Sequence, residues 1–499
     1  MPKKIKTTTN NIRLRFPPSP TGPLHIGNAR TLLFNYLFAK KYNGRIVLRI
    51  EDTDTERSKL YWADEIMDEL RWLGMEWDEG PDIGGNFGPY KQSQRSDIYK
   101  KYLETLLEEK KAYYCFCQAD ELEAKKQERM SRGLAPKYDG KCRNLPRKTI
   151  EANLKEDRPS VIRFKIHEKK LKFNDLIRED VEFDTGLIGD VIIAKSFTEP
   201  LYNFAVVVDD FLMQISHVIR GEDHISNTPR QILIQEALGF DRVIYGHLPL
   251  LLNPDKSKMS KRAGDVAVSD YHKNGYLPEA LINFMALLGW NPGTEKEFFS
   301  LHELIKEFSI EKVQKAGAVF NLQKLDYLNG HYIREKSLSS LTKLCLPYLS
   351  EFNTAQYSPK NLEKIIEAYR TRLKKLSDIK DFTDFFFAEK LEYDKKLLTW
   401  KEMGDSEVKL SLQHCAALLS RAENFDKKSL EELLVAEADK FNPSNSSGQV
   451  PKNRGYLLWP LRVALSGKEA SASPFEIAEI LGKGKTLQRI SDAIGSLSV

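Results

Sequence analysis

The sequence predicts an α/β fold, in which a domain built on a parallel sheet is interrupted by an inserted domain and followed by an all-α C-terminal region. A short alternating strand at residues 12–16 leads through a Pro/Gly turn into a helix at about residues 27–42. Strand and helix patterns keep alternating to about residue 97, and beyond Arg334 the pattern is almost wholly helical. A strand, a helix and a second strand in this order favour a parallel sheet with right-handed crossovers.

Two more elements of the first part follow from local patterns. Residues 45–50 form an apolar-rich strand, directly after the turn signal of Asn43 and Gly44. Residues 61–73 form an amphipathic helix, and its apolar side chains fall on one face: Trp62, Ile66, Leu70 and Leu73. Both elements continue the alternation expected of a parallel sheet.

The middle of the chain departs from this rhythm. A charged helix at residues 96–111 precedes a stretch with cysteines, and an extended run follows at residues 160–166. We interpret residues 98–209 as an insertion between two halves of the α/β domain. Strand patterns then resume at residues 215–220 and 243–252. These observations predict four parts: residues 1–97, 98–209, 210–334 and 335–499.

Two short motifs lie more than two hundred residues apart. Residues 15–28 read RFPPSPTGPLHIGN and pass from a strand through a tight turn to a helix start. Free backbone N–H groups and the helix dipole make such a start an anion site. Residues 258–262 read KMSKR and place two lysines around a serine on a loop. Together the motifs predict two halves of one ATP site, and the absence of GxGxxG weighs against a nicotinamide cofactor.

The two motifs resemble the HIGH and KMSKS signatures of class I aminoacyl-tRNA synthetases. The sequence around them resembles bacterial-type glutamyl-tRNA synthetase over four stretches: residues 15–27, 48–54, 202–210 and 217–224. The resemblance implies a Rossmann-like class I synthetase catalytic domain, an inserted connective domain that binds the tRNA acceptor end, and a helical anticodon-binding region. Asn28 departs from the general signature, which has a histidine there, and removes one candidate phosphate contact.

The resemblance implies roles for the two motifs. His25, Lys258 and Lys261 would be catalytic, with Lys261 at the β- and γ-phosphates where charge develops on the leaving pyrophosphate. Gly27 would let the adenine lie on the backbone, and Ser260 would join Lys261 in binding ATP with Mg²⁺. Taken singly, a turn histidine and a solvated basic loop are the alternatives.

A substrate amino acid with a side-chain carboxylate needs an arginine fork at one end and an acidic partner for its ammonium group at the other. The resemblance implies that Arg15 and Ser19 contact the glutamate and that Glu51 meets its α-amino group. Tyr202 and Arg220 would line the side-chain pocket. For each charged residue alone, a surface ion pair is the alternative.

Three cysteines give a metal signal. Cys115 and Cys117 form a CxC pair, and Cys142 follows. Three thiolates are one ligand short of a closed zinc site. Many members of the resembled family complete it with a histidine where this chain has Asn144, and a related zinc-bearing group uses a tyrosine that matches Tyr138. Zinc and three reduced structural cysteines both stay open.

Composition sets outer limits on the function. The chain has 499 residues, 41% of them hydrophobic, and no apolar run long enough for a membrane span. Five cysteines in such a chain fit a reducing, cytoplasmic location, and a net charge of +5 alone announces no nucleic-acid partner. Basic segments at residues 370–375 and 452–462 carry aromatic or apolar neighbours, as expected of tRNA contacts or of solvated helix faces.

The sequence therefore predicts a glutamate–tRNA ligase that charges tRNA(Glu), with ATP, glutamate and tRNA as substrates and a monomeric state. One alternative is a non-discriminating enzyme that also charges tRNA(Gln). The other is a catalytically silent tRNA-binding homologue, against which the intact His25, Glu51 and Lys261 argue.

Overall fold

The computed structural model describes residues 12–54, 58–259, 267–441 and 453–497. The chain divides into two compact units. The first unit comprises residues 1–273 and 278–325, and the second comprises residues 274–277 and 326–499. Each unit is described by itself below.

The first unit begins with the predicted strand, turn and helix. Strand β1 (Arg13–Phe16) is buried along its whole length and pairs in parallel with β2 (Arg45–Leu48). Helix α1 (Ile26–Lys41) connects them, and its residues 32–39 are all buried and mostly apolar. The amphipathic helix α2 (Leu60–Trp72) follows, with one buried face. All four elements lie within two residues of the predicted bounds.

The middle of the chain forms an antiparallel sheet and an extension of a second sheet. Strand β4 lies between β3 and β7, while β5 pairs antiparallel with β6 and in parallel with β9. The elements in order are α3 (Ser96–Glu108), β3 (Ala112–Cys115), α4 (Ala119–Ser131), α5 (Arg147–Lys155), β4 (Val161–Phe164), β5 (Lys170–Asp175), β6 (Glu179–Asp184), β7 (Val191–Ala194) and α6 (Tyr202–Leu212).

The parallel strands resume at β8 (His217–Gly221) and β9 (Ile244–Leu248), joined by α7 (Thr228–Leu238). Ser216, the residue directly before β8, ties this sheet to the start of the chain, because its N–H donates to the Arg13 carbonyl at 2.9 Å. The prediction of one strand over residues 243–252 is wrong. The structure has β9 and a separate β10 (Leu251–Leu252), since Pro249 has no N–H to continue the ladder.

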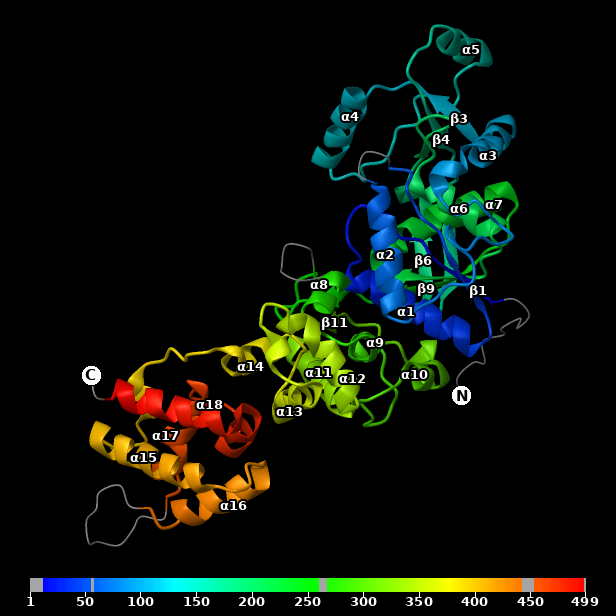
Figure 1. The fold of residues 1–499 in the computed structure, drawn as a ribbon. Helices are drawn as coiled ribbons and strands as arrows, with labels where there is room; N and C mark the ends of the chain where they lie inside the picture. The colour runs from blue at the N-terminus through cyan, green and yellow to red at the C-terminus, as the bar shows by residue number, and fades with distance from the viewer. Residues whose placement is uncertain (1–11, 55–57, 260–266, 442–452, 498–499) are drawn as a thin grey trace. The chain divides into compact units, whose positions relative to one another are not determined.

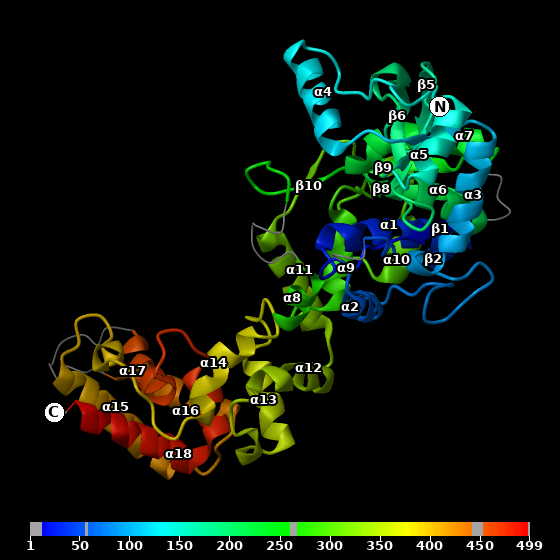
Figure 2. The same cartoon turned by 90° about the horizontal axis from the view of Figure 1, so that it is seen from above.

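Helices cover the strands of the first unit in two groups. Helix α1 packs against β1, β2 and β8, and against α9 (Pro278–Leu287) and α10 (Leu301–Glu307). Helices α3, α6 and α7 pack together as the second group (Figures 1 and 2). Two short elements complete the unit: α8 (Val268–Lys273) and β11 (Ala318–Val319), which pairs with β10.

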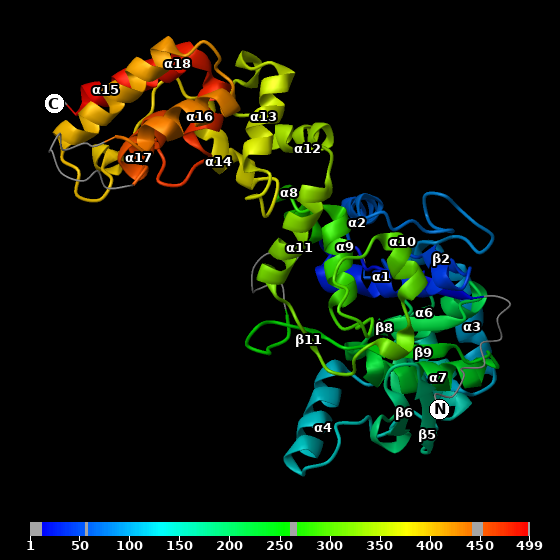
Figure 3. The same ribbon diagram turned by 90° about the horizontal axis from the view of Figure 1, so that it is seen from below.

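The second unit is helical, and its described residues 326–441 and 453–497 contain no strand. Helices α15, α17 and α18 pack against one another, with α16 against α17 and α18 (Figure 3). Helix α11 (Leu322–Glu335) enters the unit, followed by α12 (Leu338–Cys345), α13 (Pro359–Tyr369), α14 (Asp378–Phe387), α15 (Asp405–Arg421), α16 (Lys427–Ala438), α17 (Gly455–Ser466) and α18 (Pro474–Ser496). Within the described residues, no helix combines the length and apolar character needed to cross a membrane.

Candidate active site

One cavity of about 870 Å³ in the first unit gathers most of the site residues expected from the sequence. Eight of them line it: Arg15, Ser19, His25, Gly27, Glu51, Tyr202, Arg220 and Lys258. They come from β1, the turn before α1, the first turn of α1, the segment after β2, α6, β8 and the segment after β10. The remaining two, Ser260 and Lys261, lie outside the described residues.

The start of α1 opens on this cavity. His25 is the N-cap residue in an extended conformation, and its Nδ1 accepts the Gly27 N–H at 3.0 Å. A Cβ at position 27 would lie 3.2 Å from that Nδ1, so glycine leaves room which another residue would fill. The first turn carries no acidic side chain. No carboxylate of the first turn therefore offsets the positive end of the helix dipole.

The beginning of the KMSKR motif lies beside β10. The Met259 N–H donates to the Leu251 carbonyl at 3.0 Å, which holds this segment against the strand. Lys258 Nζ lies 3.5 Å from an Asp223 carboxylate oxygen, and both side chains are about half exposed. Such an exposed pair costs little to separate, so Lys258 can exchange this partner for an anion in the cavity.

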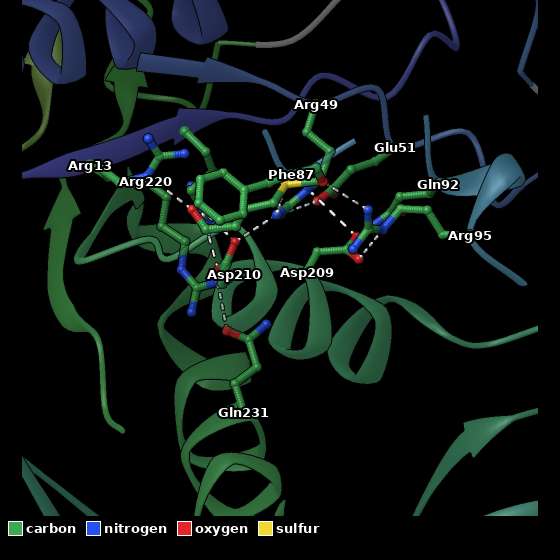
Figure 4. Close-up of polar contacts among 12 residues, drawn as sticks. Arg13, Arg49, Glu51, Phe87, Gln92, Arg95, Asp209, Asp210, Arg220 and Gln231 are labelled. Atoms are coloured by element: carbon green, nitrogen blue, oxygen red, sulfur yellow. Dashed lines mark hydrogen bonds and ion pairs between the residues drawn. The ribbon is translucent and has the colours of Figure 1, made fainter. Parts of the chain in front are cut away.

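A network of buried charged residues adjoins the cavity, and Figure 4 shows its polar contacts. Arg49 is fully buried, and its guanidinium lies 2.8 Å from Asp210, 3.0 Å from Glu51 and 3.7 Å from Asp209. Burial alone would lower the pKa of Arg49, but the three carboxylates outweigh it and raise the pKa. One guanidinium therefore serves as the shared countercharge of three acids.

The two aspartates link this network to both sides. Asp210 also accepts from Arg15 Nε at 3.3 Å, so it ties a cavity-lining arginine to Arg49. Asp209 is fully buried and has a full set of donors: Gln92 at 2.8 Å, Arg95 at 2.7 Å and Tyr99 at 2.9 Å. Both carboxylates are thus paired and hydrogen-bonded, the condition under which buried charges persist.

Glu51 lies where this network meets the cavity. Burial raises the pKa of Glu51, and the guanidinium groups of Arg49 and Arg15 oppose that rise. A cationic ligand group in the cavity would act in the same direction as the two arginines. Glu51 is therefore suited to pair with an ammonium group.

Arg220 is a second cationic group that lines the cavity. Its guanidinium donates to Gln231 at 2.9 Å, to Thr228 at 2.8 Å and to His247 at 3.3 Å. Tyr202 lies nearby, with its hydroxyl 3.3 Å from His224 Nδ1. Burial, helped by Arg220, lowers the pKa of His224 to about 4, so His224 adds no positive charge at neutral pH.

The cysteine cluster is a separate site and does not line the cavity. The thiols of Cys115, Cys117 and Cys142 lie within 4.8 Å of one another. The Tyr138 hydroxyl is 3.5 Å from Cys115 Sγ and 3.4 Å from Cys117 Sγ, and it accepts the Cys142 N–H at 2.9 Å. Three thiols and one phenol oxygen converge here, a donor number that suits tetrahedral Zn²⁺.

The basic segments of the second unit differ in how much their side chains are already used. Arg370 donates to the Lys336 carbonyl at 2.7 Å and so contributes to packing. Arg462 stacks over the Trp459 ring with 4.4 Å between guanidinium carbon and ring centroid. Lys452 lies outside the described residues.

Several residues at the site had no role predicted from the sequence. Arg49, Asp209 and Asp210 build the buried network, and Thr228 and His247 hold Arg220. The sequence feature that could have indicated them is charge next to apolar residues, since Asp209 and Asp210 end the run YNFAVVVDD. That signal marks burial but identifies no partner.

Fold and site together define a class I aminoacyl-tRNA synthetase. The family model described as "tRNA synthetases class I (E and Q), catalytic domain" matches residues 11–327, and the model described as "Anticodon binding domain" matches residues 340–494. The predicted fold class is confirmed. Membership of this class implies ATP as a substrate.

Curated relatives with similar sequences narrow this class to one amino acid, glutamate. "Glutamate--tRNA ligase 1" of Caldicellulosiruptor saccharolyticus is 47% identical over 96% of this chain and 98% of its own length. "Glutamate--tRNA ligase" of Carboxydothermus hydrogenoformans is 43% identical over 96% and 99%. A crystal structure of a glutamate tRNA ligase from Elizabethkingia meningosepticum in complex with its amino acid shares 35% identity, covers 98% of this chain and 100% of its own, and has a TM-score of 0.86. The chain belongs to the glutamate–tRNA ligase family, as predicted.

The buried network makes a prediction about stability. Asp209→Asn removes a buried charge that faces Arg49 and Arg95, and should lower the free energy of unfolding by about 3–5 kcal/mol. Urea unfolding measures the effect. Asp68→Asn is the matched control, because Asp68 pairs with Arg71 on the surface and is 75% exposed; it should change stability by less than about 1 kcal/mol. Equal unfolding midpoints for the two variants would contradict the network.

Proposed function

We propose that this chain joins glutamate and ATP to form glutamyl-adenylate and pyrophosphate, and then transfers the glutamyl group to the 3′ end of tRNA(Glu). In the first step an oxygen of the α-carboxylate of glutamate attacks the α-phosphorus of ATP, and the bond between that phosphorus and the pyrophosphate oxygen breaks. In the second step a hydroxyl of the terminal ribose attacks the carbonyl carbon, and AMP leaves. The observation that carries the proposal is the single cavity that joins the α1 N-terminus, Lys258 and a set of buried charges suited to an amino acid.

The ATP end of the site relies on positioning and charge. The start of α1, with His25 and Gly27, receives the nucleotide, and Lys258 and Lys261 take the phosphates together with Ser260. Mg²⁺ accompanies the ATP, and phosphate oxygens and water supply most of its ligands. Phosphate-centred reactions of this kind need preorganised positive charge more than covalent participation by the protein.

The part of the site that binds glutamate uses two arginines, Arg15 and Arg220, and one acid, Glu51. Arg220 and Tyr202 receive the side-chain carboxylate, with Arg220 as the fork. Glu51 receives the α-ammonium group, and Arg15 with Ser19 contacts the remaining part of the amino acid. A buried fork that expects a carboxylate leaves donors unmatched against a neutral amide, and this disfavours glutamine.

The parts of the chain divide the remaining work. Residues 1–97 and 210–334 form the two halves of the catalytic domain, residues 98–209 bind the acceptor end of the tRNA, and residues 335–499 bind its anticodon. Lysine and arginine side chains of the helical part contact phosphates, and aromatic faces such as that of Trp459 stack on unpaired bases. A monomeric enzyme in the cytoplasm remains our expectation.

Aminoacylation assays test the proposed function. Purified protein with ATP and Mg²⁺ should attach glutamate, but not glutamine, to tRNA(Glu). Separate assays with tRNA(Gln) decide between a discriminating and a non-discriminating enzyme, and we expect the discriminating one. Tight tRNA binding without any charging of either tRNA would contradict the proposal and favour a silent tRNA-binding homologue.

We further propose that Cys115, Cys117, Tyr138 and Cys142 hold one Zn²⁺ ion. The three thiols and the phenol oxygen already lie close together, and Cys115 and Cys142 are buried. When bound, the metal would cross-link β3 to the loop before α5 and stabilise this part of the fold.

Metal analysis tests the zinc proposal. Protein prepared without chelator should contain about one zinc per chain, and Cys142→Ser should lose it because a serine hydroxyl is a poor ligand for Zn²⁺. Cys345→Ala, which changes a buried cysteine of the second unit, should keep the metal. Zinc-free wild-type protein would instead favour three reduced structural cysteines.

A further inference from the structure

Arg220 is held by a small set of buried partners. It lies on β8 directly opposite His247 of β9, its partner in the parallel register. Among the described contacts, each of its three nitrogens has one acceptor: His247 for Nε, Gln231 for Nη1 and Thr228 for Nη2. A guanidinium has five N–H groups, so these contacts leave two for a ligand in the cavity that Arg220 lines.

His247 can accept from Arg220 only in one tautomer. Its Nδ1 lies 2.6 Å from an Asp175 carboxylate oxygen, which accepts and so places the proton on Nδ1. Its Nε2 then carries a lone pair, 3.3 Å from Arg220 Nε and 3.0 Å from the Thr228 hydroxyl. The opposite tautomer would present an N–H to the Arg220 N–H.

Asp175 is itself fixed at the end of β5. It is 1% exposed, and its Oδ1 accepts the backbone N–H groups of Ile177, Arg178 and His247 at 2.9, 2.8 and 3.1 Å. Hydrogen bonds from His247 and from these N–H groups hold the pKa of Asp175 below its usual value although burial opposes this. The carboxylate therefore stays charged and can only accept.

We infer that Asp175 and His247 are positioning residues for substrate selection, and that together they orient the Arg220 guanidinium toward the side-chain carboxylate of the amino acid. Asp175 fixes the His247 tautomer, and His247 fixes Arg220 through Nε. The inference rests on the proposed function, in which Arg220 receives the glutamate side chain. It adds a specificity device supplied by β5, a strand inside the region between residues 98 and 209.

The charges around His247 are consistent with this role. The group faces Asp175, Arg178 and Arg220, with the Tyr245 ring stacked 6.1 Å away. Burial lowers the pKa of His247, Arg220 and Arg178 lower it further, and Asp175 opposes them. The imidazole is therefore neutral at neutral pH and remains an acceptor for Arg220.

Three variants test the inference in the full-length enzyme, through KM for glutamate and for ATP in aminoacylation of tRNA(Glu). Asp175→Asn can donate to Nδ1 and so selects the wrong tautomer; it should raise KM for glutamate roughly tenfold and KM for ATP less than twofold. His247→Asn keeps a group near the Nδ1 position but loses the acceptor for Arg220, so it should have the same effect. His247→Gln puts an amide oxygen near the Nε2 position and should restore KM for glutamate most of the way.

A double variant distinguishes a positioning role of Asp175 from a general role in stabilising the fold. In the His247→Gln background Asp175→Asn should have no further effect, since glutamine has no tautomer to fix. His217→Asn, at a buried histidine that contacts Ser216 and Phe38, is the control and should leave both KM values unchanged. An equal loss from Asp175→Asn in both backgrounds would overturn the inference.

The proposed function and this inference fail in different ways. If wild-type enzyme does not charge tRNA with glutamate, both are wrong. If wild-type enzyme charges tRNA and Arg220→Gln raises KM for glutamate, the proposed role of Arg220 stands. In that case an unchanged KM in Asp175→Asn and His247→Asn overturns the positioning role alone.

Discussion

The active site depends on one buried guanidinium. Arg49 sits at the end of β2 and pairs with Glu51, Asp209 and Asp210, which otherwise would be three acids without a shared countercharge in the protein interior. Removing one partner from such a cluster costs several kcal/mol, because the others stay buried. The network thereby connects β2 with α6, two elements about 160 residues apart in the chain.

This arrangement explains how the cavity can present charged groups in fixed positions. Asp210 holds Arg15, and His247, Thr228 and Gln231 hold Arg220. Preorganised charges of this kind bind an amino acid without first having to be arranged. The N-terminus of α1 adds an anion site made of backbone N–H groups, and Lys258 lines the same cavity.

The sequence predicted those features that depend on local pattern. Strand, turn and helix around His25 follow from periodicity and turn residues within about thirty positions, and eight of the ten residues expected in the cavity line it. Arg49 with Asp209, and His247 with Asp175, were not predicted, because their partners are far away in the chain and only folding brings them together. The break at Pro249 was also not predicted. The mostly apolar run around Pro249 suggested one continuous strand, although proline has no N–H for the ladder.

Under the proposed function, Arg49 organises the end of the site that binds the amino acid, and the Arg49→Lys variant tests this role. Lysine keeps the positive charge but cannot bridge three carboxylates as a planar fork can. We expect KM for glutamate to rise at least about tenfold while KM for ATP changes little. Arg45→Lys, at a neighbouring arginine that is 59% exposed, should change neither. Circular dichroism confirms that both variants are folded. A folded Arg49→Lys enzyme with wild-type KM for glutamate would show that Arg49 does not have this role.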